Sequence, residues 1–351
     1  MRLLIITQKV DKEDDAFSFF HRWIVEFAKH CEQVTVVALG VGKYDLPANV
    51  RVFSLGKERG VSRASYLASF YSIIWRERKN YDFVFVHMNP IYVILGGVFW
   101  QMWNKKIALW YTHKNVDLKL RLAEKLAHII FSASQKSFRL PSKKLFVAGH
   151  GIDVDIFKFS PRQPESKLRI ITAGRISPVK NLETLFDATL ILIKENMPVH
   201  VEIVGDIAQK SDEKYFEKLR LLIHKNGLEE QIHFAGRVPN SDLPHFLTDA
   251  DIFVNMSETG SLDKGVLEAM AMGIIPVTSN EAFREIFGGN SDLLMFPPKN
   301  AQDLAKRLSE LTTLSVSQRN ELVTHLRQII VEKHNLAVLI PRLVNSMVSL
   351  R

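Results

Sequence analysis

Short apolar runs alternate with amphipathic stretches along this chain, and no other feature restricts its fold as strongly. Runs such as 3–7, 168–172 and 252–255 are rich in Leu, Ile and Val, which is typical of parallel strands buried on both faces. The stretches between such runs place apolar residues at helical spacing, for example over 182–195. Strands that alternate with helices predict parallel sheets covered by helices. The sequence therefore predicts an α/β fold of doubly wound parallel sheets.

The same pattern assigns elements to both halves of the chain. In the first half we expect strands over 3–7, 33–38, 50–54, 83–86, 107–110, 129–132 and 144–147, and helices over 16–30, 64–79, 91–103 and 118–127. In the second half we expect strands over 168–172, 200–204, 232–235, 252–255 and 275–278, and helices over 182–195, 212–224, 241–248, 266–272 and 301–312. Each half is then a doubly wound unit of its own.

The length of the chain and a proline-containing segment without apolar periodicity predict two domains. A chain of 351 residues exceeds what one hydrophobic core normally holds. The segment 159–166 has two prolines and no apolar periodicity, so we expect it to be the linker. The expected domains are Rossmann-like and cover 1–160 and 161–334, and a C-terminal helix, about 335–351, can pack back on the first. Open parallel sheets bind ligands beyond the carboxyl ends of their strands, so two such sheets facing each other predict an interdomain cleft.

The net charge of +8 belongs to the first half of the chain. Residues 1–160 hold 24 Lys and Arg against 14 Asp and Glu, whereas residues 161–351 hold 22 against 24. One interpretation is a solvated surface tuned for solubility. The other is contact with an anionic partner, either membrane phosphates or an acidic acceptor. No recognition motif accompanies the charge, so nucleic acid is not an expected partner.

Three features of the sequence predict the cellular compartment of the protein. The chain starts without a signal-peptide pattern, and its longest apolar run, 91–103, is too short to span a bilayer. The single cysteine, Cys31, excludes an internal disulfide and is expected to be a buried thiol. We expect a cytoplasmic protein, with a peripheral position on the inner face of the membrane as the alternative. Core packing accounts for most aromatic residues of helix 16–30, with Phe17 or Trp23 as candidate lipid contacts.

A first short segment that carries chemistry is 174–181, Gly-Arg-Ile-Ser-Pro-Val-Lys-Asn, directly after an apolar run. Arg175 and Lys180 flank a strand-to-helix turn that Gly174 helps to shape. Cations in front of free helix amides suit a diphosphate group. The competing interpretation is that both are ordinary surface cations on a loop.

The second segment is 259–271, Thr-Gly-Ser-Leu-Asp-Lys-Gly-Val-Leu-Glu-Ala-Met-Ala. Its small residues, Gly260, Ser261 and Gly265, allow a ligand to approach the backbone. Glu268 stands in a helix rich in Ala and Met, where an unpaired buried carboxylate would be costly. A ribose diol or an internal salt bridge would each give it a partner. Together the two segments predict a nucleotide-diphosphate site.

With these motifs the chain resembles glycosyltransferase family 4, also called glycosyl transferases group 1, whose members are retaining enzymes of the GT-B fold. The matching segments are Gly-Arg-x4-Lys-Asn from Gly174, Leu-Glu-Ala-Met-Ala-x-Gly-x-x-Pro-Val from Leu267, and 149–157, 234–238 and 250–254. The resemblance covers about residues 1–340 and is sharpest from 149 to 280.

The resemblance implies a retaining, metal-independent hexosyltransferase that moves a sugar from a nucleotide-diphosphate sugar to a hydroxyl acceptor, in cell-surface glycan or glycolipid synthesis. A UDP-sugar is the favoured donor and GDP-mannose the alternative. The acceptor would be a glycan or a lipid-linked acceptor. The nucleotide sugar is a substrate, so no cofactor and no metal are expected. The first domain would bind the acceptor and the second the donor.

The resemblance also implies roles for single residues. Arg175 and Lys180 would be catalytic cations on the donor diphosphate, and Glu268 would bind the ribose hydroxyls. His113, at the end of a first-domain strand, resembles the family's active-site histidine near the transferred sugar. Backbone groups around Arg237 and Val238 would meet the nucleobase. The other expected donor-binding residues are Gly174, Gly260, Ser261, Leu262, Asp263 and Lys264, and the possible acceptor or sugar contacts are His87 and Glu258.

Two departures from the family pattern leave the sugar and the acceptor open. The usual acidic pair is spaced eight residues apart, but Gly260 stands eight before Glu268. Glu258 or Asp263 could replace the missing first acid. The usual glycine pair of the first loop is also absent, and 8–15 occupies its place.

Other classes of function are considered as well. A nucleotide-sugar epimerase of the same fold would release nucleotide from the donor without forming a glycoside, and a noncatalytic nucleotide-sugar-binding scaffold would explain the missing acid. A nicotinamide oxidoreductase is disfavoured, because no strand is followed by Gly-x-Gly-x-x-Gly. Asp-x-Asp at 153–155 and 249–251 matches metal-dependent sugar transferases. Their places, in the interdomain segment and at a strand entrance, argue against a metal role.

Overall fold

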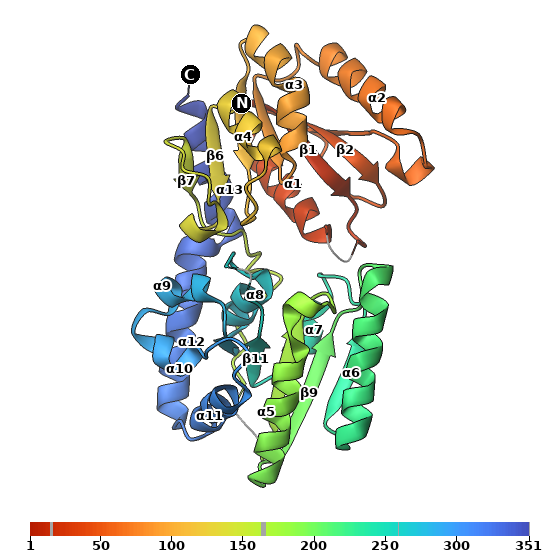
Figure 1. The fold of residues 1–351 in the computed structure, drawn as a ribbon. Helices are drawn as coiled ribbons and strands as arrows, with labels where there is room; N and C mark the ends of the chain where they lie inside the picture. The colour runs from red at the N-terminus through yellow and green to blue at the C-terminus, as the bar shows by residue number, and fades with distance from the viewer. Residues whose placement is uncertain (15–16, 163–165, 259, 351) are drawn as a thin grey trace. The chain divides into compact units, whose positions relative to one another are not determined.

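The computed structural model describes residues 1–14, 17–162, 166–258 and 260–350 (Figure 1). The chain divides into two compact units: unit 1 is Met1–Asp153 with Lys333–Arg351, and unit 2 is Val154–Glu332. The chain thus enters unit 2 before the expected linker. Within that segment the backbone N–H of Ser160 donates to the carbonyl oxygen of Met272 over 3.0 Å, and residues 163–165 lie outside the described part.

Unit 1 is built on a seven-stranded sheet in the order β3-β2-β1-β4-β5-β6-β7, with every pair of neighbours parallel. The chain order reverses between β1 and β4, which makes the switch point where open sheets bind ligands. The strands are β1 (Arg2–Val10), β2 (Gln33–Val41), β3 (Val50–Ser54), β4 (Phe83–His87), β5 (Lys106–Trp110), β6 (Ile129–Ser132) and β7 (Leu145–Val147).

Helices cover both faces of this sheet. Leu4 and Ile6 of β1 join a core with side chains of α2, α3 and α4. Leu3 and Ile5 point to the other face and are fully buried as well, on the side where α1 packs against β1 and α13. This double burial explains the continuous apolar runs of the sequence. The helices are α1 (Ser18–His30), α2 (Arg63–Arg76), α3 (Pro90–Met102), α4 (Leu118–Leu126) and α13 (Leu336–Val348).

Unit 2 has a five-stranded parallel sheet in the order β10-β9-β8-β11-β12, with its switch point between β8 and β11. Helix α11 packs against α5, whereas α7 and α12 pack against α8. The strands are β8 (Leu168–Ala173), β9 (Val199–Val204), β10 (Ile232–Gly236), β11 (Ile252–Asn255) and β12 (Ile275–Thr278). The helices are α5 (Leu182–Lys194), α6 (Glu213–Asn226), α7 (Leu243–Leu247), α8 (Lys264–Met272), α9 (Arg284–Phe287), α10 (Ser291–Leu294), α11 (Ala301–Thr312) and α12 (Val316–Ile329).

Each strand expected from the sequence is present, so the predicted α/β fold is confirmed. The largest shifts are at β1 and β2, which each continue three residues past their expected ends because Lys9 and Val10 still pair with Gly40 and Val41. The loop expected from residue 8 therefore begins at residue 11. Helix α1 is described from Ser18, and the expected start at residue 16 lies outside the described part.

Helix α12 was missed by the periodicity argument. It begins with a capping box, in which the Ser315 side chain accepts from the backbone of Gln318 and the Gln318 side chain accepts from the backbone of Ser315. The spacing Ser-x-x-Gln was a visible start signal.

Two expectations for single side chains have clear outcomes. Cys31 is buried, as predicted, and burial raises the pKa of its thiol to about 11. The lipid contact suggested for Trp23 is wrong, because Trp23 is 1% exposed and packs edge-on against Trp110 at 4.9 Å between ring centroids. Within the described ranges, no helix is both long and apolar enough to cross a bilayer.

Candidate active site

Both segments expected to bind a donor follow neighbouring strands of unit 2. Residues 174–181 follow β8 and pass through a 3-10 turn, Pro178–Lys180, into α5. Residues 256–258 follow β11, and residues 260–263 lead into α8. Because β8 and β11 pair in parallel at the switch point, their carboxyl ends bring the two segments to the same edge of the sheet.

Two glycines let the chain turn tightly at the end of β8. Gly174 has φ 141° and Gly205, which follows β9, has φ 136°, values that favour glycine. A Cβ atom on Gly205 would clash with the carbonyl oxygen of Gly174. A Cβ atom on Gly174 would lie 3.1 Å from Cε of Lys180. Glycine at position 174 therefore leaves room for the Lys180 side chain.

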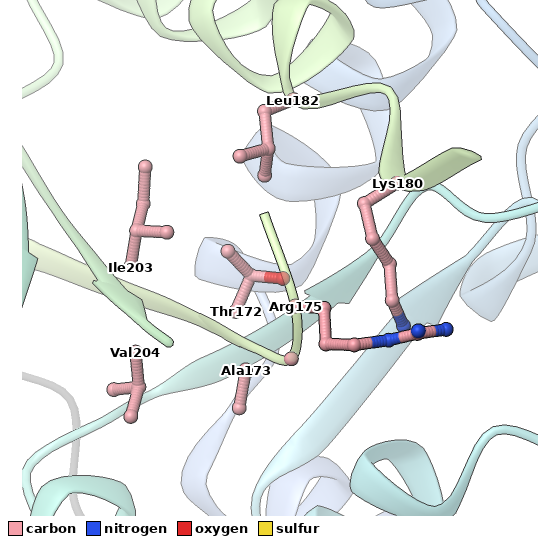
Figure 2. Close-up of a pocket in the computed structure, with 8 residues that line it drawn as sticks. Thr172, Ala173, Arg175, Lys180, Leu182, Ile203 and Val204 are labelled. Carbon is pink, nitrogen blue, oxygen red and sulfur yellow. The ribbon is translucent and has the colours of Figure 1, made fainter. Parts of the chain in front are cut away.

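A small pocket that opens to solvent lies at this strand end. Figure 2 shows the Arg175 side chain extending to the right, away from the apolar lining residues, and the Lys180 side chain extending downward, so that their charged ends overlap in this view. Arg175 is exposed and forms no ion pair with any described residue. The pocket is lined by Thr172, Ala173, Gly174, Arg175, Lys180, Leu182, Ile203 and Val204. An apolar hollow with two cations suits a ligand that carries an anionic group.

Lys180 is held by the carboxylate of Asp263. The distance from Lys180 Nζ to Asp263 Oδ2 is 2.6 Å, and the two side chains are 23% and 13% exposed. Burial by itself raises the pKa of Asp263, but the Lys180 charge and hydrogen bonds from Lys180, Asn255 and the Gly265 backbone outweigh burial and hold that pKa below its usual value. Asp263 is therefore an anion that fixes the position of the Lys180 ammonium group.

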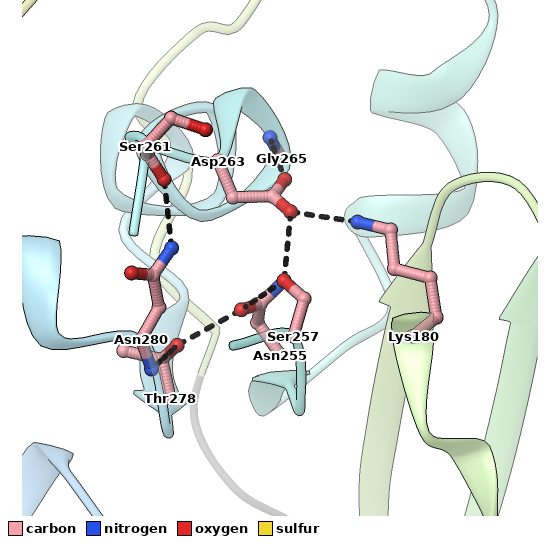
Figure 3. A network of polar contacts seen from close by, with 8 residues as sticks. All are labelled: Lys180, Asn255, Ser257, Ser261, Asp263, Gly265, Thr278 and Asn280. Carbon is pink, nitrogen blue, oxygen red and sulfur yellow. Dashed lines mark hydrogen bonds and ion pairs between the residues drawn. The ribbon is translucent and has the colours of Figure 1, made fainter. Parts of the chain in front are cut away.

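Buried polar side chains in turn hold Asp263 (Figure 3). The Asn255 amide donates to Asp263 Oδ2 over 2.9 Å, and the Ser257 hydroxyl lies 3.3 Å from the same oxygen. Thr278, at the end of β12, donates to Asn255 Oδ1 over 2.9 Å. Asn280 Nδ2 donates to the Ser261 carbonyl over 2.8 Å. The loop before α8 is thus tied to the ends of β11 and β12.

Glu268 has protein partners inside α8 and beside it. Its side chain is 3% exposed, and Oε1 lies 2.9 Å from Lys264 Nζ. Asn240 Nδ2 donates to the same oxygen over 3.0 Å, and Lys264 Nζ donates to Asn240 Oδ1 over 3.2 Å. The internal salt bridge considered for Glu268 is therefore present, and its ribose contact stays a prediction.

The remaining unit 2 residues of the predicted site occupy the surrounding loops. Arg237 and Val238 directly follow β10, and the Arg237 guanidinium donates to the Ile207 carbonyl over 3.2 Å. Glu258 pairs with Lys299 at 3.3 Å, with 44% of the Glu258 side chain exposed. Among the described contacts, Asp263 rather than Glu258 is the acid joined to Lys180. Gly260, Ser261 and Leu262 form the loop that leads to the Asp263 helix cap.

Both candidate histidines belong to unit 1. His113 follows β5 and is exposed, and its Nδ1 accepts from the backbone of Asn115 over 3.1 Å. His87 ends β4, is 2% exposed and stacks on Phe20 at 3.9 Å between ring centroids. Burial lowers the pKa of His87 to about 3, so the ring is neutral near pH 7. The structure gives His87 a packing contact, and its acceptor contact stays a prediction.

The two Asp-x-Asp motifs have structural partners. Asp153 Oδ2 accepts from Arg22 Nε over 2.6 Å. Asp251 is 1% exposed and accepts from the backbone of Arg169 over 2.9 Å. Among the described residues, no group of three or more His, Cys, Asp or Glu side chains is arranged to hold a metal ion.

Sequence reasoning missed the asparagines that organise this site. Asn255 and Asn240 contact Asp263 and Glu268, yet neither was singled out. Asn255 had a signal, because it is the polar residue that ends the apolar run of β11 at a strand's carboxyl end. Asn240 lies in a loop after β10, and no local pattern marks it.

Two parallel-sheet, Rossmann-like units in one chain define the GT-B fold, and comparison with known structures agrees. A crystal structure of Anabaena Alr3699/HepE in complex with UDP and glucose superposes with a TM-score of 0.79 over 99% of this chain and 100% of that one, at 16% identity. At this identity the likeness shows the fold alone.

Comparison of sequences identifies the family. The family described as Glycosyl transferases group 1 matches residues 153–328, which is half of the chain. The chain belongs to this family, as the sequence motifs predicted.

Two curated relatives illustrate its range. The putative colanic acid biosynthesis glycosyltransferase WcaL of Salmonella typhimurium is 26% identical over 298 residues, or 82% of this chain and 65% of that protein. The human GDP-Man:Man(3)GlcNAc(2)-PP-Dol alpha-1,2-mannosyltransferase is 22% identical over 161 residues, or 44% of this chain and 33% of that protein. This chain thus spans less than two thirds of the length of either relative.

Proposed function

We propose that this protein is a glycosyltransferase that transfers a sugar from a nucleotide-diphosphate sugar to a hydroxyl group of an acceptor. The observation that carries the proposal is the pair of cations at the β8 pocket, Arg175 and Lys180, of which Lys180 is held by Asp263. The departing nucleotide diphosphate gains negative charge as the sugar bond breaks. Cations at that place stabilise the transition state more than the bound donor, by ~3 kcal/mol for each group.

In this proposal the reaction retains the anomeric configuration and uses neither a metal nor a cofactor. The bond between the anomeric carbon and the diphosphate oxygen breaks, and the acceptor oxygen bonds to that carbon on the same face. The acceptor proton passes to the departing phosphate oxygen, so the protein need not supply a base. The amides at the start of α8 add hydrogen-bond donors for the diphosphate.

The donor is recognised through its diphosphate and its ribose. The two known contacts of Glu268 end on Oε1, so Oε2 is the oxygen that would accept from a ribose hydroxyl. A UDP-sugar is the favoured donor, supported by the UDP complex of the Anabaena protein. GDP-mannose is the alternative, supported by the name of the human relative. Backbone groups at Arg237 and Val238 would face the base.

The acceptor side of the proposal rests on unit 1 and on the curated relatives. The WcaL name supports a role in glycan biosynthesis, with a glycan or a lipid-linked acceptor. His113 would lie near the transferred sugar. The transfer reaction would take place in the cytoplasm, with the protein in a peripheral position on the inner face of the membrane.

The test combines a binding screen with donor turnover. Thermal unfolding is measured with UDP, GDP, ADP and their sugars, because a ligand that binds the folded state raises the melting temperature. Nucleotide release from the stabilising donor is then compared for the wild type, Arg175→Ala and the control Arg220→Ala, which removes an exposed arginine of α6.

We expect Arg175→Ala to lower nucleotide release by roughly 10²-fold or more and Arg220→Ala to leave it unchanged. Equal, negligible release in the wild type and Arg175→Ala would overturn the enzymatic proposal in favour of a binding scaffold. Release without any glycoside product, across glycan and lipid-linked acceptors, would favour the epimerase.

A further inference from the structure

One face of unit 1 exposes large apolar side chains that the proposed transfer reaction does not use. Met102 is 74% exposed, Leu118 69% and Trp75 54%. Among the described residues, helices α2, α3 and α4 carry seven of the sixteen exposed large hydrophobic side chains. The seven, here called the apolar patch, are Leu67 and Trp75 of α2, Val98, Phe99 and Met102 of α3, and Leu118 and Leu122 of α4.

The apolar patch is carried by three helices that contact one another in turn. Trp75 of α2 lies edge-on to Trp103 at 5.5 Å, and Tyr71 of α2 lies edge-on to Phe99 of α3 at 5.6 Å between ring centroids. Helix α3 also packs against α4. The three helices cover the same face of the sheet (Figure 1). Apolar surface gathered in this way on a soluble protein marks a contact with a partner or a membrane.

Positive charge predominates in the segment of the chain that carries the apolar patch. Residues 63–126 contain ten Lys and Arg against four Asp and Glu. All four acids have partners within unit 1: Glu77 pairs with Arg76 and Arg51, Asp82 with Arg2 and Lys105, Asp117 caps α4, and Glu124 accepts from Ser142. The positive surplus is therefore available to an external anion.

One contact shows how the two kinds of side chain combine. The guanidinium of Arg78 lies over the Trp75 ring at 4.6 Å. At a bilayer surface, aromatic rings settle at the level of the headgroups while long basic side chains reach the phosphates. Two copies of this protein would instead bring two positive faces together, so self-association through the patch is opposed by repulsion.

We propose that the apolar patch and the basic side chains around it bind the surface of a membrane rich in acidic phospholipids. Trp75, Phe99 and Met102 enter the interfacial layer, and Arg78 and Lys79 contact lipid phosphates. The attachment is peripheral and independent of donor chemistry. It also uses a different surface from the helix first suspected in the sequence, whose Trp23 is buried.

The test uses the full chain and co-sedimentation with two kinds of vesicle, phosphatidylcholine mixed with phosphatidylglycerol and phosphatidylcholine alone. We expect binding to the mixed vesicles that weakens as salt is added, and little binding to the neutral ones. Met102→Ser combined with Leu118→Ser should weaken binding to mixed vesicles by roughly tenfold. The matched control is Leu221→Ser, which changes a side chain of α6 that is 68% exposed.

A second pair of variants tests the charges. Arg78→Gln combined with Lys79→Gln should weaken binding to mixed vesicles by roughly tenfold or more, since each cation near an anionic surface accounts for about a fivefold change. Arg220→Gln combined with Lys225→Gln removes two exposed cations of α6 and should leave binding unchanged. Brominated lipid should quench the wild-type emission more than that of Trp75→Phe.

The proposal is overturned if the patch variants bind mixed vesicles as well as their controls do, or if neutral vesicles bind equally well. It is also overturned if no vesicle binds and the chain forms dimers that Met102→Ser with Leu118→Ser dissolves, because the patch is then a contact between copies. Circular dichroism and melting temperature check that the variants fold. Nucleotide release in solution, unaffected in these variants, separates this proposal from the proposed function.

Discussion

The sheets of units 1 and 2 share a doubly wound topology but differ at the edge where such sheets bind ligands. In unit 2 the strand ends carry charge and amides, with Lys180, Asp263 and Asn255 in contact. In unit 1 the end of β4 carries an aromatic contact instead, because the His87 ring stacks on the ring of Phe20 near the start of α1. The topology decides where a site can lie, and the residues at the strand ends decide which chemistry it offers.

The same contrast predicts two different responses to acid. Unit 2 holds a buried ionised aspartate beside a lysine, whereas unit 1 holds a buried neutral histidine. The two responses can be measured separately, because all five tryptophans of the chain lie in unit 1. Tryptophan emission therefore reports the unfolding of unit 1, and circular dichroism reports both units.

Lys180→Ala should have the largest effect, because it removes a cation from the proposed diphosphate site and leaves Asp263 buried beside its amide partners. We expect donor turnover to fall by roughly 10²–10³-fold. We also expect the free energy of unfolding of unit 2 to fall by ~1–3 kcal/mol. Nucleotide-release assays and urea unfolding followed by circular dichroism measure the two effects.

The double variant Lys180→Ala with Asp263→Asn sharpens this result. Replacing the carboxylate by a neutral amide removes the cost of an unpaired buried charge, so part of the stability should return while turnover stays low. Full turnover in either variant would show that donor turnover does not need the Lys180 cation. The charged strand ends of unit 2 would then not account for its proposed role in donor binding.

His87→Phe should change the response of unit 1 to mild acid. The pKa of His87 is lowered to about 3 in the folded state from 6.5, so as the pH falls below 6.5 the unfolded state binds a proton that the folded state does not. Unit 1 should lose up to ~1.4 kcal/mol per pH unit from this group between those two values, and nothing above 6.5. Urea midpoints from tryptophan emission, from neutral pH to about pH 5, should fall less in His87→Phe than in the wild type. Equal slopes would contradict the buried neutral ring.

Asp263→Asn should affect unit 2 in a lower pH range. Because the pKa of Asp263 is held below its ordinary value of 3.8, its contribution is fully present above that value and is lost as the pH falls through the lowered pKa. Asp263→Asn should therefore be less stable than the wild type near neutrality, with the difference shrinking below about pH 4. Melting followed by circular dichroism measures this difference in stability. A difference that grows as the pH falls would contradict a lowered pKa for Asp263.

Glu258→Gln should have the smallest effect. Its ion pair with Lys299 joins side chains that are 44% and 71% exposed, and such pairs contribute about 0–1 kcal/mol. We expect unfolding free energy to change by less than ~0.5 kcal/mol and donor turnover to stay within about twofold. A loss of turnover like that of Lys180→Ala would instead identify Glu258 as the acid that replaces the missing member of the family pair.

Much of the fold was predictable because burial on both faces of a parallel sheet leaves a strong local record. The apolar runs 168–172 and 252–255 predicted β8 and β11, and Gly174 predicted the turn after β8. Helix α12 escaped because its stripe of apolar residues is weak, although its capping box was readable.

The sequence by itself determined the two sheets, most of their helices, the family, the strand end that Arg175 and Lys180 follow, and the helix that carries Glu268. Tertiary structure alone decided which groups meet: Lys180 with Asp263 rather than Glu258, Glu268 with Lys264 and Asn240, and Trp75 at the surface with Trp23 inside. Periodicity is a property of neighbouring residues, so it can be read along the chain. The partner of a charge and the exposure of a ring depend on segments far apart in sequence that only the folded strands bring together.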